Sequence, residues 1–131
     1  MSWYDRKGKL IVDDNLFRTD REAYEKQMRD FALVGIDDPK YKIVKQEYLW
    51  WGGWLSTVWL GLDHSHGEGK PLIFESMLFY KSWSEIDMDR YSTEKEAFEG
   101  HERMKKEWSS VLKIPEILKI ILYRLLNKRN Y

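Results

Sequence analysis

Cysteine is absent from the 131-residue sequence, which excludes disulfides, thiolate zinc sites and cysteine nucleophiles. No apolar run approaches the roughly 20 residues of a membrane-spanning helix, and residues 2–12 lack the apolar segment of a secretory signal. An excess of one charge is also missing, because 22 Lys and Arg balance 22 Asp and Glu. We therefore expect a cytoplasmic protein without a cofactor, and neither a membrane nor a nucleic-acid polymer as its partner.

Aromatic residues, by contrast, are abundant at 15% of the chain. Residues 50–80 hold four of the seven tryptophans and two of the three histidines. Within this stretch, residues 54–62 and 72–80 are rich in β-branched and aromatic side chains, which predicts two strands joined by a long polar loop. The residues that most strongly predict a core and those that most strongly predict a site therefore lie in the same stretch.

The predicted sheet extends on both sides of this stretch. Residues 41–51 form a further expected strand, and Gly52-Gly53 suits a two-residue hairpin turn with two positive φ angles. That turn places Trp51 opposite Trp54, and both faces of the hairpin then carry large apolar groups. Residues 81–90 are acidic and polar and are expected to form a connection. A sheet that is apolar on both faces must be covered twice, by helices or by another subunit.

Capping boxes predict two helices. Thr19 to Glu22 has the spacing that opens a helix over residues 20–33, for which Gly35 is the expected stop. Thr93 and Glu96 open a second helix, in which Gly100 indicates close approach of another group. The stripe of this second helix that we expect to face the sheet comprises Ala97, Phe98, His101, Met104 and Trp108.

A third helix is predicted from Pro115 onward, with basic charge and an apolar stripe of Ile117, Leu118, Ile121, Leu122 and Leu125. The chain is thus expected to be one α+β domain, residues 1–131, with a three- to four-stranded antiparallel sheet and a helix packed on it. Its parts are an N-terminal strand and helix (1–35), the sheet-plus-helix core (41–108) and the basic amphipathic C-terminal helix (115–129).

Two kinds of site fit the polar residues of the core. Asp63, His64, His66, Glu75 and His101 suit a divalent metal, although no spacing motif requires one, and the same residues also suit a hydrogen-bonded loop and a core histidine. Alternatively, arginine, histidine and the free N–H groups of a helix start suit a small anionic ligand. The candidate ligand-binding residues are Asp63, His64, Glu75, Arg90, Tyr91 and His101.

The tryptophans around the hairpin turn are candidates for an interface. Trp50, Trp51 and Trp54 expose more apolar area than a monomer tolerates unless something covers them. The chain's own helices can do so, and self-association is the competing explanation. We expect a homo-oligomer whose interface includes this turn or Leu122 on the last helix.

Four sequence blocks carry a resemblance to a known family: residues 56–64 (STVWLGLDH), 71–77 (PLIFESM), 90–93 (RYST) and 100–101 (GH). With these blocks in this order, the chain resembles a family of small proteins encoded by tailed bacteriophages and prophages. The resemblance covers residues 41–108. It implies a viral origin and a location in the host cytoplasm, and it gives no mechanism.

Two functions remain open. The first is a non-enzymatic phage accessory protein that binds a host factor or a small anionic, nucleotide-like ligand, for instance to counter a host defence. The second is a small metal-dependent enzyme that uses the His, Asp and Glu residues. No nucleophile elbow is present, and the metal pattern is weak, so the sequence favours the first.

Overall fold

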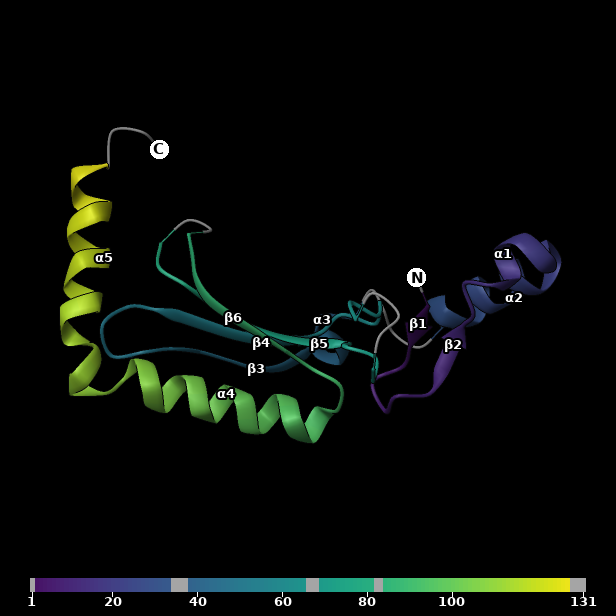
Figure 1. The fold of residues 1–131 in the computed structure, drawn as a ribbon, viewed down its shortest axis with the longest axis horizontal. Helices are drawn as coiled ribbons and strands as arrows, with labels where there is room; N and C mark the ends of the chain where they lie inside the picture. The colour runs from purple at the N-terminus through teal and green to yellow at the C-terminus, as the bar shows by residue number, and fades with distance from the viewer. Residues whose placement is uncertain (1, 34–37, 66–68, 82–83, 128–131) are drawn as a thin grey trace.

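The structure, a computed structural model, describes residues 2–33, 38–65, 69–81 and 84–127. It confirms the predicted α+β class, with helices in both the N-terminal and the C-terminal part of the chain (Figure 1). The elements are β1 (Trp3–Tyr4), β2 (Leu10–Val12), α1 (Leu16–Thr19), α2 (Arg21–Ala32), α3 (Pro39–Lys42), β3 (Ile43–Tyr48), β4 (Trp54–Trp59), β5 (Phe74–Phe79), β6 (Glu85–Tyr91), α4 (Glu94–Trp108), the 3-10 turn η1 (Val111–Lys113) and α5 (Ile114–Leu126).

A four-stranded antiparallel sheet in the order β3-β4-β5-β6 forms the centre of the molecule. Its fourth strand, β6, lies where the sequence predicted only a connection. The alternation of β6 explains the difference, since Asp87, Asp89 and Tyr91 point to one face and are satisfied there by partners on α4. The Trp108 Nε1–H group donates to Asp87, and Arg103 donates to Asp89. The aspartates of β6 can therefore face α4, because side chains of that helix satisfy them.

The predicted hairpin register is wrong by three residues. Tyr48, rather than Trp51, lies opposite Trp54. The N–H group of Leu49 donates to the Gly53 oxygen, which closes a wider loop, and only Gly52 of the glycine pair has a positive φ, of 99°. A shift by an odd number of residues exchanges the two faces of a strand.

Trp51 explains why this wider loop forms. Its ring folds back under the loop, and its Nε1–H group donates to the Trp108 oxygen over 2.8 Å. Burying an indole with its N–H satisfied stabilises the loop more than an exposed cross-strand pair with Trp54 would.

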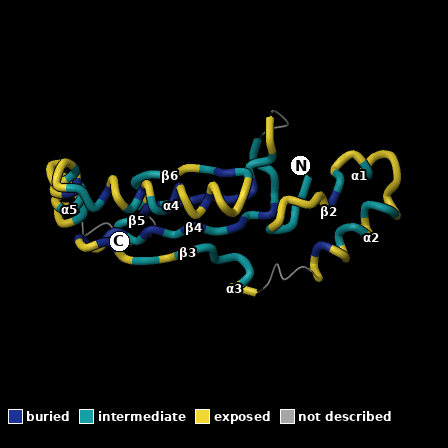
Figure 2. Tube along the Cα trace, turned by 90° about the horizontal axis from the view of Figure 1, so that it is seen from below, coloured by how far each residue is buried: buried dark blue, intermediate teal, exposed yellow. Residues whose placement is uncertain are grey.

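Helix α4 covers one face of the sheet along its length (Figure 2). Its N-cap is confirmed, because the Thr93 side chain accepts from the Glu96 N–H group. The close approach at Gly100 is also confirmed, since a Cβ there would overlap the Tyr91 ring. The predicted stripe is correct except for Phe98, which is 49% exposed. The residues that α4 buries are Ala97, Gly100, His101, Met104 and Trp108.

Two apolar clusters flank the middle of the sheet. One joins the N-terminal elements to the end of β4 through Phe31, Trp59 and Tyr91, and its neighbours include the strand residue Trp3. In α2, Asp20 rather than Thr19 is the N-cap, accepting from the Ala23 N–H group. The predicted stop at Gly35 lies outside the described residues. The second cluster joins the β3–β4 loop to the helices: Leu49, Trp51, Leu55, Leu78, Met104, Trp108 and Ile117.

Helix α5 rises beside the end of the sheet, at the left of Figure 1. It begins at Ile114, with Pro115 in its first turn as predicted. The predicted apolar stripe is divided, because Ile117 is buried while Leu118, Leu122 and Leu125 are more than half exposed. Among the described residues, no helix has the length and apolar character needed to cross a membrane.

Candidate functional site

The structure distributes the predicted site residues over three places. Asp63 organises the loop after β4, where its Oδ1 accepts from the N–H groups of Ser65 (2.8 Å) and Leu72 (2.9 Å). Burial raises the pKa of Asp63, but the hydrogen bonds from Ser65 and Leu72 outweigh it and hold the pKa below its usual value. The His64 N–H group donates to the Leu72 oxygen, which closes the same loop. His66 lies outside the described residues.

The other predicted residues lie on opposite faces of the sheet. Tyr91 and His101 are on the face that α4 covers, where the Tyr91 hydroxyl donates to the Met104 sulfur. Glu75 points to the uncovered face, where its Oε2 lies 2.9 Å from the Arg90 Nε. Because the sheet separates His101 from Glu75, the six predicted residues do not form one shared site.

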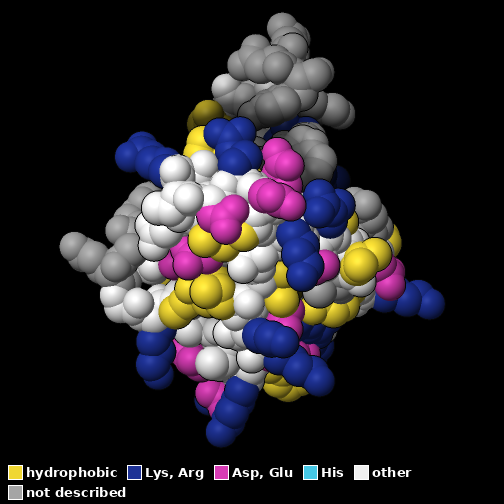
Figure 3. Space-filling model, turned by 90° about the vertical axis from the view of Figure 1, so that its right-hand side faces the viewer, with side chains coloured by type: hydrophobic (Ala, Val, Ile, Leu, Met, Phe, Trp, Pro, Cys, Tyr) yellow, Lys and Arg dark blue, Asp and Glu magenta, His cyan; other side chains and the backbone are white. Residues whose placement is uncertain are grey.

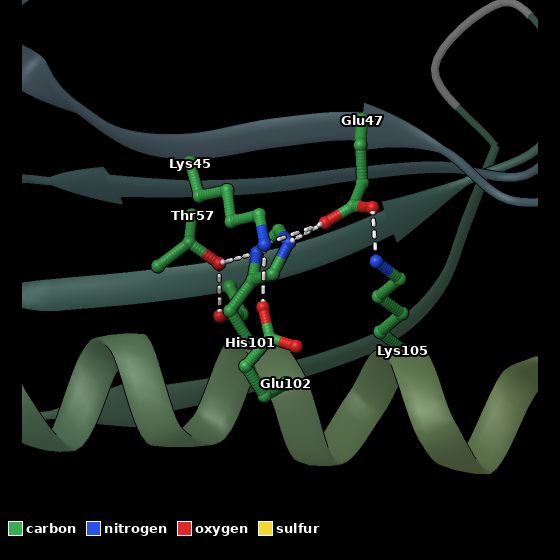
Figure 4. A network of polar contacts seen from close by, with 7 residues as sticks. Lys45, Glu47, Thr57, His101, Glu102 and Lys105 are labelled. Carbon is green, nitrogen blue, oxygen red and sulfur yellow. Dashed lines mark hydrogen bonds and ion pairs between the residues drawn. The ribbon is translucent and has the colours of Figure 1, made fainter.

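A buried chain of polar groups connects three strands to α4 (Figure 4). The Ser76 hydroxyl lies 2.5 Å from the Thr57 hydroxyl, which lies 2.7 Å from Nδ1 of His101. On the other side of the ring, Nε2 of His101 lies 2.7 Å from Oε2 of Glu47. Thr57, Ser76 and His101 each have an exposed fraction of 0%. The polar side-chain atoms of these three residues therefore depend on their neighbours in the chain, since water does not reach them.

One arrangement of hydrogens satisfies the whole chain with a neutral histidine. The Glu47 carboxylate can only accept, so His101 carries its proton on Nε2 and donates it there. Nδ1 is then an acceptor for the Thr57 hydroxyl, and the Thr57 oxygen accepts from Ser76. The imidazole is thus fixed in one tautomer by a carboxylate on one side and a hydroxyl on the other.

Charged side chains surround the outer end of this chain. Burial raises the pKa of Glu47, but hydrogen bonds from Lys105 and His101 and the charge of Lys45 outweigh it and lower the pKa to about 2. Lys45 also binds Glu102 at 2.6 Å, which raises the pKa of Lys45 and lowers that of Glu102. Two lysines therefore balance two carboxylates.

The residue types of the buried chain are those of nucleophilic catalysis, with a hydroxyl, a histidine and a carboxylate in hydrogen-bond contact. Their burial prevents that chemistry, because no substrate reaches Thr57 or Ser76. The ligand atoms of Glu47, His101 and Glu102 also lie within 4.8 Å of one another, a spacing that suits a divalent cation. A cation there would have to displace lysines that already bind both carboxylates.

Sequence reasoning found His101 and missed its partners. Thr57 and Ser76 occupy strand positions whose neighbours two residues away are apolar, so alternation alone marked them as inward-facing. The two hydroxyls could therefore have been predicted to face the core. Glu47 could not, because the predicted register placed it on the face opposite α4.

The uncovered face of the sheet carries a groove of about 700 Å³. Its walls are mainly aromatic and aliphatic, and Tyr48 and Trp54 pack together at one end with ring centroids 4.6 Å apart. In the middle, the Gln46 amide donates to the Ser56 hydroxyl over 2.8 Å. The lining residues are Gln46, Tyr48, Gly52, Trp54, Ser56, Val58, Glu75, Met77, Phe79 and Lys81.

The groove has one charged group of each sign among its lining residues. Glu75 lies toward the end where Arg90 binds it, and Lys81 follows β5 at the opposite end, beside the β3–β4 loop. Apolar walls with a few placed polar groups are typical of small-molecule sites, and the volume is within their usual range of about 300–1,000 Å³. Of the predicted ligand-binding residues, Glu75 lines this groove and Arg90 supports it.

The predicted interface residues also separate. Trp51 is buried in the chain's own core, Trp54 lines the groove, and Trp50 and Leu122 remain exposed.

At the other end of the molecule, basic and acidic side chains are interspersed on the surface that Figure 3 shows. No family model, curated protein or solved structure matches the chain, so the resemblance to phage proteins remains a prediction.

Proposed function

We propose that the protein is a non-enzymatic phage accessory protein that holds a small anionic, nucleotide-like ligand in the groove of its uncovered sheet face. The single observation that carries this proposal is the contrast between the two faces. His101 and the hydroxyls of Thr57 and Ser76 are sealed beneath α4 with 0% exposure. The accessible face instead offers an aromatic groove of ligand size.

The lining residues suit the parts of a nucleotide. Trp54 and Tyr48 offer aromatic faces for a planar base, and such stacking contributes roughly 1–3 kcal/mol per base. At the other end of the groove, the Glu75 carboxylate is held in place by Arg90 and is an acceptor for a hydroxyl or amino group on the part of the ligand farthest from the stacked base. Lys81 is the cation for a phosphate oxygen. A ligand of this kind would lie along β5 between its two charged ends.

Calorimetric titration with GMP, AMP and a cyclic dinucleotide tests the proposal. Trp54→Ala and Lys81→Ala should each weaken binding at least tenfold while the melting temperature changes little. Trp50→Ala is the matched control, because Trp50 is exposed outside the groove. Parent protein that binds none of these probes at millimolar concentration would contradict the proposal.

Native mass spectrometry of protein isolated from infected cells tests the viral setting and the identity of the ligand together. A bound mass that the Trp54→Ala variant loses would identify the natural ligand. An unliganded parent whose expression leaves host defence intact would argue against the accessory role.

The alternative, a metal-dependent enzyme, is favoured by one observation, the spacing of Glu47, His101 and Glu102. Zinc or manganese should then raise the melting temperature of the parent and leave that of Glu102→Gln unchanged. We favour the groove, because the lysines beside Glu47 and Glu102 already neutralise these carboxylates.

A further inference from the structure

The outer face of the last segment of the described chain carries a regular apolar stripe. Val111, Pro115, Leu118, Leu122 and Leu125 follow one another at intervals of four, three, four and three residues. All five are exposed, and the fractions for the three leucines are 53%, 56% and 62%. Within α5, the alternation of three and four over Pro115, Leu118, Leu122 and Leu125 is the heptad spacing of a seam between two helices, and Val111 precedes it in the 3-10 turn η1.

The inner face of α5 is a separate stripe that already holds the helix on the molecule. Ile117 is 2% exposed and belongs to the cluster with Trp51 and Trp108. Ile120 and Ile121 pack against the same cluster. The outer leucines are therefore not needed to dock α5 on its own chain, although exposed leucines in a repeating stripe are unfavourable in water.

We propose that this seam binds the α5 helix of a second copy, so that the protein is a homodimer. The seam is suited to a copy of itself, because a two-fold pair brings the same leucine stripe from both sides. The charged residues of α5 are Glu116, Lys119 and Arg124, so its net charge is only +1, and repulsion between two copies is weak.

The exposed apolar surface of this segment suits a dimer. Six apolar side chains of the segment are more than half exposed: Val111, Leu112, Leu118, Leu122, Leu125 and Leu126. A two-fold pair brings this set together from both copies, and interfaces smaller than the standard of roughly 800 Å² per partner still form weak or transient complexes. The dimer is independent of the groove, since none of these residues lines it.

Sedimentation velocity at 5–100 μM, a range chosen around typical micromolar affinities, tests the dimer. The parent should sediment at about twice its 15.9 kDa chain mass, whereas Leu118→Glu and Leu122→Glu should sediment as monomers with unchanged circular dichroism. Leu33→Glu is the matched control, because Leu33 is 84% exposed on α2's C-terminal side and should leave the dimer intact. A monomeric parent at 100 μM, or dimeric glutamate variants, would overturn the proposal.

The absence of cysteine permits a second test that does not depend on disrupting the interface. Leu122→Cys, treated with a short bis-maleimide, should form a covalent dimer in high yield, and Leu33→Cys should remain a monomer. Equal crosslinking of the two variants would show that the contacts are random collisions and would refute the seam.

Discussion

Nε2 of His101 lies 2.7 Å from Oε2 of Glu47, and this hydrogen bond joins the middle of α4 to strand β3 across 54 positions of sequence. The contact fixes the imidazole tautomer, and with Lys105 it also sets the charge state of the carboxylate. The strength of the packing between α4 and the sheet should therefore depend on pH through Glu47.

Glu47 should make the protein sensitive to acid. Its pKa is about 2 in the folded protein against an ordinary value of 4.5, so its contribution is present above about pH 4.5 and is lost as the pH falls toward 2. We expect the free energy of unfolding to fall by on the order of 2 kcal/mol more in the parent than in Glu47→Gln between pH 6 and pH 3. Urea titrations at several pH values measure this, with Glu22→Gln on the exposed side of α2 as the control. Parallel pH curves for parent and Glu47→Gln would contradict it.

Gly100→Ala should destabilise the protein even though alanine is the better helix former by about 1 kcal/mol. The new methyl group would overlap the buried Tyr91 ring, and overpacking of this kind costs roughly 1–3 kcal/mol. We expect a lower melting temperature by calorimetry. Combining Gly100→Ala with Tyr91→Leu should cost less than the sum of the two single changes. A higher melting temperature for Gly100→Ala would show that the ring moves aside without cost.

Two adjacent tryptophans should respond very differently to the same substitution. Trp51→Ala removes a ring that is 8% exposed, packs on Trp108 and donates to its oxygen, so we expect a loss of about 3–5 kcal/mol. Trp50→Ala removes a ring that is 65% exposed and should cost less than 1 kcal/mol. Equilibrium unfolding in urea compares the two, and equal losses would contradict the loop conformation.

The Glu75–Arg90 pair should behave as a coupled unit. Arg90→Met leaves the Glu75 carboxylate, which is 10% exposed, without its partner, so we expect a loss of roughly 2 kcal/mol. The double variant Glu75→Gln, Arg90→Met should recover part of that loss, because no unpaired charge remains. A double-mutant cycle measures the coupling, and simple additivity would mean that water already screens the pair.

Local signals predicted the helices well, because the relevant interactions lie within a few residues. The Thr93 cap and the inward placement of His101 both follow from spacing along one helix. The close approach at Gly100 was also predictable, since glycine inside a helix indicates a steric demand. The pairing between strands was not predictable in the same way, because it depends on a distant contact. Trp51 binds Trp108, 57 residues away, and this contact widens the β3–β4 loop and shifts the register.

The candidate site shows the same division. His101 and Glu75 were identified as residue types, but a sheet separates them, and only the observed register shows on which face each lies. The sheet was expected to be covered on both faces, whereas one face is open, and the lining of the groove there depends on Tyr48 standing opposite Trp54. A three-residue change in register would have placed Tyr48 under α4.

The order β3-β4-β5-β6 has a kinetic consequence, because each strand pairs only with its neighbours along the chain. Loop closures within the sheet are short, and proteins dominated by such local contacts fold quickly. The sheet can therefore assemble hairpin by hairpin in the order of synthesis, before α4 emerges to cover one side. Thr57 and Ser76 are therefore expected to lose their water only when α4 packs on this face and brings His101 to them.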